Sequence, residues 1–398
     1  MRLGPEQSPA PLLQLARIQG PGKTTTSTRA RLRAMPPSPF SAPMPYQPKI
    51  VEFPRTVPAL GQVDWRGGVL LRSTNWLGDM LMTLPAAWQL KGFLPAGVPL
   101  WVAAPAGLAP LWQAAPWVDG VIPFDGKRMD AQTRQQVRKH DFGLGVVFPN
   151  SFGSAWDLWR CAIPRRLGRA GAFRGWMLTD SIPRWKPHEG EGKWHQLSWY
   201  LELVGTLGKV ALSPQCPPLA VHPAPAQALG MEKGKGWVAM APGAAYGPAK
   251  QWPEEYFVQV ARALLKENCR VVVVGAPKEA ALTARIAAGA PGALDLGGKT
   301  PLPALMSVLA QADAVLANDS GSMHLAAALG TPGVAIFAST DPVATGPLGA
   351  PWELQVAQVD CRPCLQRQCP WAGARQYLCM KSLPPEPVLE SLRHLLKR

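Results

Sequence analysis

The chain has 398 residues, 47% of them hydrophobic and 17% charged, and its formal net charge at pH 7 is +15. This length and composition allow two ordinary domains with buried cores and exclude a wholly disordered chain. The longest uncharged run, Gly92 to Val118, contains five prolines, a pattern that argues against a membrane-spanning helix.

The basic charge is concentrated in the first part of the chain. Residues 1–60 carry eight Lys and Arg against Glu6 and Glu52 and are rich in Pro, Ser and Thr, which is typical of disorder. We therefore predict a disordered basic extension over residues 1–65. Residues 61–220 carry a further charge of +6, which indicates either an anionic partner or a solvated surface.

From residue 67, short apolar strands alternate with amphipathic helices. In the first half we predict strands at Val69–Arg72, Leu100–Ala103, Gly120–Pro123 and Leu144–Phe148, and helices over 79–90 and 130–139. A Pro- and Ala-rich stretch around 214–225 predicts a linker. In the second half we predict strands at Trp237–Ala241, Arg270–Val274, Ala314–Ala317 and Val334–Phe337, and helices over 254–267, 278–288 and 302–310.

Two successive series of this kind predict an α/β fold with two Rossmann-like parallel-sheet domains, 66–220 and 230–398, that face each other across a cleft. Ligands of such sheets bind beyond the carboxyl ends of the strands. The segments that follow the strands are therefore the first place to look for a site.

One such segment, Asn318 to His324, lies between the strand Ala314–Ala317 and an Ala/Leu-rich helix. Asp319, Ser320 and Gly321 at this junction predict a helix N-terminus, whose free backbone N–H groups can bind an anion.

A second segment, 241–253, follows the first strand of the second half. Small residues at Gly243, Ala244 and Ala245 let the backbone approach a ligand, and Lys250 adds a cation. The two segments together can hold a diphosphate. The alternative for this one is a Gly/Pro-rich loop with a solvated Lys250.

A third segment, Ser73 to Asp79, follows the first strand of the first half. Gly78 permits a tight turn, and Asp79 stands at the start of the next helix. Asp79 is either a carboxylate that caps the helix or a general base that projects into the cleft from the opposite domain.

These three segments, in this order and spacing, resemble glycosyltransferase family 9, the bacterial heptosyltransferases, and within it most closely the heptosyltransferase II group. The resemblance covers about residues 67–397. It rests on Trp76-Leu77-Gly78-Asp79-Met80, on Pro242-Gly243 through Lys250 with Trp252-Pro253, and on Asn318-Asp319-Ser320-Gly321 with Met323-His324.

The resemblance implies a GT-B fold and an inverting transfer of heptose from ADP-heptose to the inner core of lipopolysaccharide. Asp79 matches the family's catalytic carboxylate and Lys250 the residue that binds donor phosphate. Asp319, Ser320, Gly321 and His324 match the motif that contacts the diphosphate and the sugar. In looser matches, Glu279 falls at the ribose and Thr300 at the adenine. The donor-side residues are thus Gly243, Ala244, Ala245, Lys250, Glu279, Thr300, Asp319, Ser320, Gly321 and His324.

The chemistry of the residues is consistent with a single displacement. We assign no second carboxylate on the donor face, which a covalent double displacement would need. The sequence contains no Asp-x-Asp pair, so we expect no catalytic metal, and we expect no cofactor. Lys250 and the helix-start amides would stabilise the leaving diphosphate instead.

An anionic acceptor needs cations in the first domain. The tract that contains Arg160, Arg165, Arg166, Arg169 and Arg174, with Arg184 and Lys186 beyond it, supplies them. We predict acceptor binding by Arg165, Arg166 and Arg169. The alternative is that several of these residues only cap helices or pair with Asp157 and Asp180.

The resemblance further implies a cytoplasmic enzyme without a nucleic-acid partner, with peripheral contact to the cytoplasmic face of the inner membrane. Ala245 stands where the group often has Glu, and a lost carboxylate could change the sugar that is accepted. Two other functions stay open: a same-fold transferase that uses another nucleotide sugar for a cell-surface glycan, and a catalytically silent nucleotide-sugar-binding protein.

Four of the seven cysteines cluster in segment 361–379 as Cys361-x2-Cys364-x4-Cys369-x9-Cys379. Cys-x2-Cys is a common metal-binding spacing, and four thiolates can hold zinc or an iron–sulfur cluster. Reduced thiols without a metal are the alternative. The sequence does not decide between them.

Overall fold

The computed structural model describes residues 45–52, 60–183 and 193–397. Most of the predicted extension, residues 1–44 and 53–59, lies outside the described residues, and so do Arg184 and Lys186. Among the helices in the described ranges, none combines the length and the apolar character that a membrane crossing requires.

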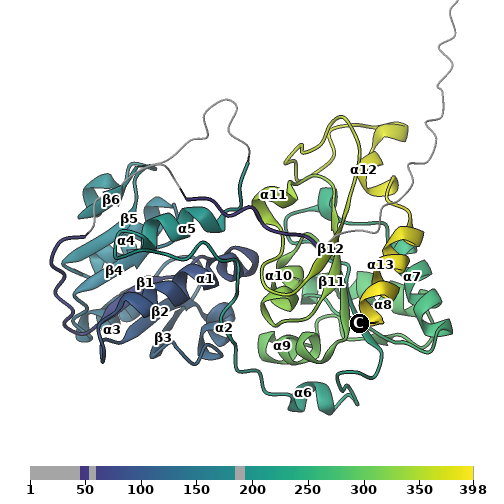
Figure 1. Ribbon diagram of the computed structural model, residues 1–398, viewed down its shortest axis with the longest axis horizontal. Coiled ribbons are helices and arrows are strands. Elements are labelled where there is room, and N and C mark those ends of the chain that lie inside the picture. The colour runs from purple at the N-terminus through teal and green to yellow at the C-terminus, as the bar shows by residue number, and fades with distance from the viewer. Residues whose placement is uncertain (1–44, 53–59, 184–192, 398) are drawn as a thin grey trace, which may run out of the picture. The chain divides into compact units, whose positions relative to one another are not determined.

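The chain forms two parallel β-sheets of six strands each, as predicted (Figure 1). The first sheet has the strand order β3-β2-β1-β4-β5-β6. Its strands are β1 (Val69–Arg72), β2 (Leu100–Pro105), β3 (Gly120–Phe124), β4 (Leu144–Val147), β5 (Arg165–Arg169) and β6 (Asp180–Ile182). Its helices are α1 (Leu77–Phe93), α2 (Ala109–Gln113), α3 (Ala131–Lys139), α4 (Phe152–Arg160) and α5 (Leu197–Val204).

The second sheet has the order β12-β11-β10-β7-β8-β9. Its strands are β7 (Trp237–Ala241), β8 (Arg270–Val273), β9 (Leu294–Asp295), β10 (Ala314–Asn318), β11 (Gly333–Phe337) and β12 (Trp352–Val356). The helices described after α5 are α6 (Ala224–Gln227), α7 (Glu254–Lys266), α8 (Ala280–Gly289), α9 (Leu302–Gln311), α10 (Gly321–Ala328), α11 (Pro342–Thr345), α12 (Leu378–Lys381) and α13 (Pro385–Leu396).

Both sheets have the same topology. Counted from its own first strand, each has the order 3-2-1-4-5-6, so the order reverses between β1 and β4 and again between β7 and β10. This is the order of the doubly wound dinucleotide-binding fold, in which ligands bind at the point of reversal.

The strands that the sequence predicts accurately are those that are completely buried. Every residue of β1, β4, β7, β10 and β11 is buried, because helices cover both faces of a parallel sheet. Such strands are continuous apolar runs, and their predicted and observed ends differ by at most one residue.

The structure adds elements that the sequence did not indicate, among them β5, β6, β12 and α13. It also divides the helix predicted over 278–288 into a short 3₁₀ turn, Pro277–Glu279, followed by α8. The turn positions Glu279 at the end of the loop that follows β8.

Candidate functional site

The three candidate segments follow strands at the two points where strand order reverses. We call residues 73–79 the turn segment, 242–253 the glycine-rich loop and 318–324 the helix-start segment. The turn segment follows β1, the glycine-rich loop follows β7, and the helix-start segment contains the end of β10. Because β10 pairs with β7 with Ala317 opposite Ala241, the last two segments begin side by side.

A buried amide joins the glycine-rich loop to the helix-start segment. The Asn318 side chain is fully buried. Its Nδ2 donates to the carbonyl of Pro242 at 2.7 Å, and its Oδ1 accepts from the backbone N–H of Trp252 at 3.1 Å. Asn318 thus fixes both ends of the loop that carries Lys250.

Lys250 forms a buried ion pair with Asp319. Lys250 Nζ lies 2.6 Å from Asp319 Oδ2, and the two side chains are 14% and 4% exposed. The same oxygen accepts a hydrogen bond from Thr340 Oγ1 at 2.5 Å. Thr340 was not predicted from the sequence; it lies three residues beyond the end of β11, the strand that neighbours β10.

Helix α10 begins at Gly321, as the sequence predicts, and Ser320 is its N-cap residue. The Ser320 hydroxyl does not cap the helix; it is buried and has no hydrogen-bond partner among the described residues. Thr74 and Ser339 also have buried, unpartnered hydroxyls, and each lies two residues beyond a strand, β1 and β11 respectively. Since buried polar groups are nearly always hydrogen-bonded, these hydroxyls mark positions where a ligand can supply the partner.

The turn segment packs directly against the helix-start segment. A Cβ atom added to Gly78 would lie 3.2 Å from His324 Cδ2, and one added to Gly321 would lie 3.1 Å from Leu77 Cδ2. The two backbones therefore approach each other at glycines, where no side chain keeps them apart. Asp79 is the third residue of α1 and stands beside this contact.

Burial shifts the pKa values of two groups in the site, Asp79 and His324, in opposite directions. Burial raises the pKa of the Asp79 carboxyl, and the charge of Lys250 partly offsets this effect. Burial also lowers the pKa of His324 to about 4, against a smaller opposing effect of Asp319. Asp79 is therefore a more basic carboxylate than usual, whereas His324 is neutral at physiological pH.

Glu279 lies against the glycine-rich loop. A Cβ atom at Gly243 would clash with the Glu279 carboxyl group, which accepts a hydrogen bond from the backbone N–H of Ala276 at 2.9 Å. Thr300 lies in the loop after β9, which is tied to the loop after β8 by the N–H of Gly298 donating to Gly275 O at 2.8 Å. The structure thus places Gly243, Glu279 and Thr300 beyond the carboxyl ends of three neighbouring strands, with Ala244 buried and Ala245 exposed in the same loop.

An arginine that the sequence did not single out supports the turn segment. Arg72, at the end of β1, is fully buried and pairs with Asp157 of α4 at 3.4 Å. Its Nη1 donates to Ser73 O and its Nη2 to Asn75 Oδ1. A charged residue at the end of an otherwise apolar strand is the signal that could have identified it.

The three arginines predicted to bind an acceptor make contacts inside the fold. Arg165 forms two hydrogen bonds with Asp180 at 3.0 Å each. Arg166 donates to the carbonyls of Met177 and Ile163. Arg169 is buried and lies 2.7 Å from Glu202. These contacts favour the structural alternative that the sequence left open, and acceptor binding by these residues stays a prediction.

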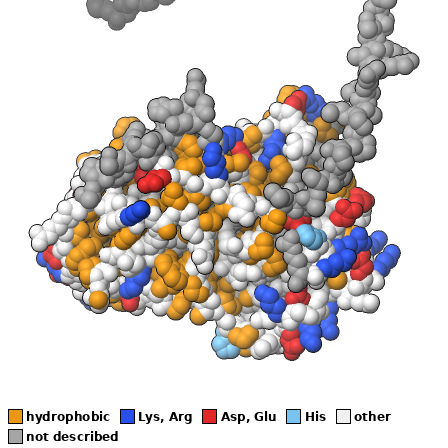
Figure 2. Space-filling model, in the orientation of Figure 1, with side chains coloured by type: hydrophobic (Ala, Val, Ile, Leu, Met, Phe, Trp, Pro, Cys, Tyr) orange, Lys and Arg blue, Asp and Glu red, His pale blue; other side chains and the backbone are white. Residues whose placement is uncertain are grey.

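On the face shown in Figure 2, Lys and Arg side chains of the described residues are interspersed with acidic and apolar ones. A cation near the turn segment is Lys127, which is exposed and whose Nζ lies 5.7 Å from the centre of the Trp76 ring.

The chain resembles known proteins over most of its length. Residues 131–374 match the family described as glycosyltransferase family 9 (heptosyltransferase). Lipopolysaccharide heptosyltransferase 2 of Salmonella typhimurium is 28% identical over 304 residues, covering 70% of this chain and 85% of that protein. Lipooligosaccharide heptosyltransferase 2 of Haemophilus influenzae is 29% identical over 300 residues, covering 70% and 86%.

A solved structure, E. coli ADP-heptose lps heptosyltransferase II, has a TM-score of 0.70 at 27% identity and covers 83% of this chain and 98% of its own. The predicted GT-B fold is thereby confirmed. With the family match spanning more than half of its length, the chain belongs to glycosyltransferase family 9, the heptosyltransferase family.

Proposed function

We propose that this protein is an inverting heptosyltransferase that transfers heptose from ADP-heptose to the inner core of lipopolysaccharide. The observation that supports this most is the convergence of the three segments. Asp79 stands where its charge interacts with Lys250, and its turn contacts the start of α10. A basic carboxylate and an anion site thus adjoin each other.

In the proposed reaction the donor diphosphate binds at the start of α10 beside Lys250. The acceptor hydroxyl attacks the anomeric carbon of heptose, and Asp79 takes its proton. The bond from that carbon to the phosphate oxygen breaks, and ADP leaves with the bonding electron pair. Lys250 and the backbone N–H groups of α10 stabilise the charge that develops on it.

We assign the remaining donor contacts from where each residue lies beyond the strands of the second sheet. Gly243 and Ala244 let the donor approach the backbone, Glu279 binds the ribose and Thr300 lies at the adenine. Asp319 and His324 contact the diphosphate and the sugar, His324 as a neutral imidazole. The buried hydroxyl of Ser320 has no partner among the described residues and would donate to a phosphate oxygen.

On the acceptor side, exposed Lys127 beside Trp76 is better placed than Arg165, Arg166 or Arg169, whose donors are engaged. We propose that Lys127 contributes to binding of the anionic acceptor. We further propose a cytoplasmic location with peripheral contact to the inner face of the inner membrane, where the acceptor is carried.

The function is tested by donor turnover. Purified full-length protein should release ADP from ADP-heptose in the presence of heptose-acceptor lipopolysaccharide, and the product should gain the mass of one heptose. UDP-glucose and ADP-glucose serve as control donors. Turnover with another nucleotide sugar in preference to ADP-heptose would favour the same-fold transferase, and tight ADP binding without turnover of any donor would favour the silent binding protein.

The pH dependence of the reaction provides a second test. A general base works only when it is deprotonated, and the pKa of Asp79 is raised above 3.8. We expect kcat/KM to increase with pH through an acid limb above that value. Because Lys250 lowers this pKa, Lys250→Met should move the limb to higher pH. An acid limb at or below 3.8, or one unchanged in Lys250→Met, would contradict the assignment.

Gly243→Ala tests the donor pocket. The new methyl group would collide with the Glu279 carboxyl group and displace it from the ribose. Since a hydrogen bond to a charged group contributes about 1.5–3 kcal/mol, binding of ADP should weaken by about tenfold to a hundredfold. Isothermal titration calorimetry measures the loss. Gly92→Ala is the matched control, because apart from its chain neighbours and its own helix backbone no atom lies within 4 Å of the added Cβ. Equal affinity in both variants would contradict the placement of Glu279.

A further inference from the structure

Lys250, the lysine assigned to the donor diphosphate, is already paired with a carboxylate. Its Nζ lies 2.6 Å from Asp319 Oδ2, and both side chains are largely buried. The two charges compensate each other, so the pair presents little net charge to a ligand. A nucleotide-sugar diphosphate is negatively charged on both phosphates, and its charge increases when the nucleotide leaves. A further cation beside Lys250 would therefore strengthen the site.

Arg367 is a cation beside Lys250 that has no such partner. Its side chain is exposed, and within the described ranges it forms neither an ion pair nor a hydrogen bond. Its guanidinium carbon lies 5.4 Å from the centre of the Tyr246 ring. Lys250 Nζ lies 4.9 Å from the centre of the same ring. The two cations thus adjoin one aromatic side chain, whose ring attracts both of them.

The backbone of Arg367 is fixed to the glycine-rich loop. Its carbonyl oxygen accepts a hydrogen bond from the backbone N–H of Ala249 at 3.1 Å. A Cβ atom added to Gly247 would collide with the same oxygen. Nearby, the Tyr246 hydroxyl donates to Leu365 O at 2.6 Å. The position of Arg367 is therefore set by the loop residues that directly precede the phosphate lysine, and not by a carboxylate that would neutralise its charge.

We propose that Arg367 binds the donor diphosphate together with Lys250. This inference rests on the donor site of the proposed function and adds a residue from outside the three segments. A guanidinium group can form two parallel hydrogen bonds with phosphate oxygens. Because no carboxylate compensates it, Arg367 contributes a positive charge that the pair of Lys250 and Asp319 does not, and this charge stabilises the departing ADP as well as the bound donor.

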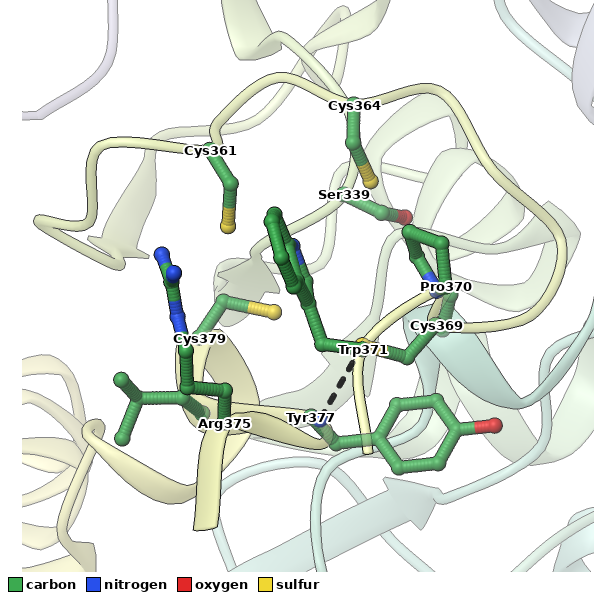
Figure 3. A pocket seen from close by; sticks show the side chains of 11 residues that line it. Ser339, Cys361, Cys364, Cys369, Pro370, Trp371, Arg375, Tyr377 and Cys379 are labelled. Carbon is green, nitrogen blue, oxygen red and sulfur yellow. Dashed lines mark hydrogen bonds between the residues drawn. The ribbon is translucent and has the colours of Figure 1, made fainter. Parts of the chain in front are cut away.

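Arg375 offers a matched control, because its guanidinium lies over a different ring. It lines the small cavity among the clustered cysteines, where its guanidinium carbon lies 4.2 Å from the centre of the Trp371 ring (Figure 3). It also lies 3.4 Å from Asp360. Both arginines are exposed and lie over an aromatic side chain, but of the two only Arg367 adjoins the ring that Lys250 contacts.

Calorimetry of ADP binding to the purified full-length protein tests the inference. Arg367→Gln should weaken ADP binding about tenfold, the effect of losing one hydrogen bond to a charged group. Arg367→Lys should recover part of this loss, because it restores the charge without the two-pronged geometry of the guanidinium. Arg375→Gln should bind ADP with the affinity of the wild type.

Ionic strength separates a charge interaction from a structural effect. The difference in ADP affinity between the wild type and Arg367→Gln should decrease when NaCl is raised from about 0.05 M to about 0.5 M, because salt screens exposed charges. A disturbed glycine-rich loop would instead give a difference that salt does not reduce.

Equal ADP affinity in the wild type and Arg367→Gln would overturn the inference and leave the proposed donor site intact. An equal loss in Arg375→Gln, or a loss in Arg367→Gln that salt does not reduce, would also overturn the inference alone. A wild-type protein that binds no ADP would overturn the proposed function, and the role of Arg367 with it.

Discussion

Replacing Asp79 with Asn is expected to lower kcat by about 10²–10⁴-fold, the usual contribution of a general base. The substitution preserves size and removes the only proton acceptor that we assign to the reaction. Donor binding should change little, because the predicted diphosphate contacts belong to other residues. Single-turnover kinetics with ADP-heptose, together with calorimetry of ADP binding, separates the two effects.

The fold should tolerate this change. The Asp79 carboxylate has no hydrogen-bond partner among the described residues, and burial disfavours its charge. Loss of the favourable interaction with the N-terminus of α1 costs about 0.3–1 kcal/mol. Asp141→Asn is the control, since Asp141 is exposed and lies just before β4, at the amino-terminal ends of the strands, whereas Asp79 lies beyond their carboxyl ends. Full transferase activity in Asp79→Asn would disprove the assignment of the base.

Lys250→Met is expected to lower kcat/KM for the donor by about 10²–10³-fold, the effect of removing one preorganised group that stabilises transition-state charge. Methionine keeps most of the length of the lysine side chain, so the loop can stay packed. The loss should appear mainly in kcat, because charge on the departing diphosphate is greatest in the transition state. Steady-state kinetics over a range of donor concentrations measures how much of the loss is in kcat and how much is in KM.

The variant has a structural consequence that needs its own control. Asp319 loses the partner of its ion pair and keeps the hydrogen bond from Thr340. Removal of one partner of a buried pair costs about 3–5 kcal/mol, so a thermal melt must show that the protein is folded at the assay temperature. The double variant Lys250→Met/Asp319→Asn removes both charges and should recover stability without recovering activity. Lys266→Met, on the exposed side of α7, should leave both unchanged. Wild-type kinetics in a folded Lys250→Met protein would contradict the phosphate role.

The central strands could be predicted from the sequence because burial on both faces makes them continuous apolar runs. The glycines of the three segments could be identified for a related reason. Gly78, Gly243 and Gly321 lie where another group approaches within contact distance of the backbone. Such positions favour glycine, and a glycine can be recognised in the sequence.

The arginine tract shows where local pattern fails. Arg165-Arg166-Leu167-Gly168-Arg169 has neither the apolar run nor the alternation of a strand, yet it forms β5. In the fold it pairs with β4 and β6, while Asp180 on β6 and Glu202 on α5 supply partners for Arg165 and Arg169. These partners are 15 and 33 residues away along the chain, so only the assembled fold brings them together.

By itself, the sequence determined the α/β class, the repeated order of elements and the three segments that follow strands, because these depend on hydrophobic pattern and on local turn chemistry. The tertiary structure decided which charges remain available to a ligand. It paired Lys250 with Asp319, engaged the arginines of β5 and raised the pKa of Asp79. The physical reason is that desolvation and ion pairing depend on neighbours in space, which residue spacing along a chain does not specify.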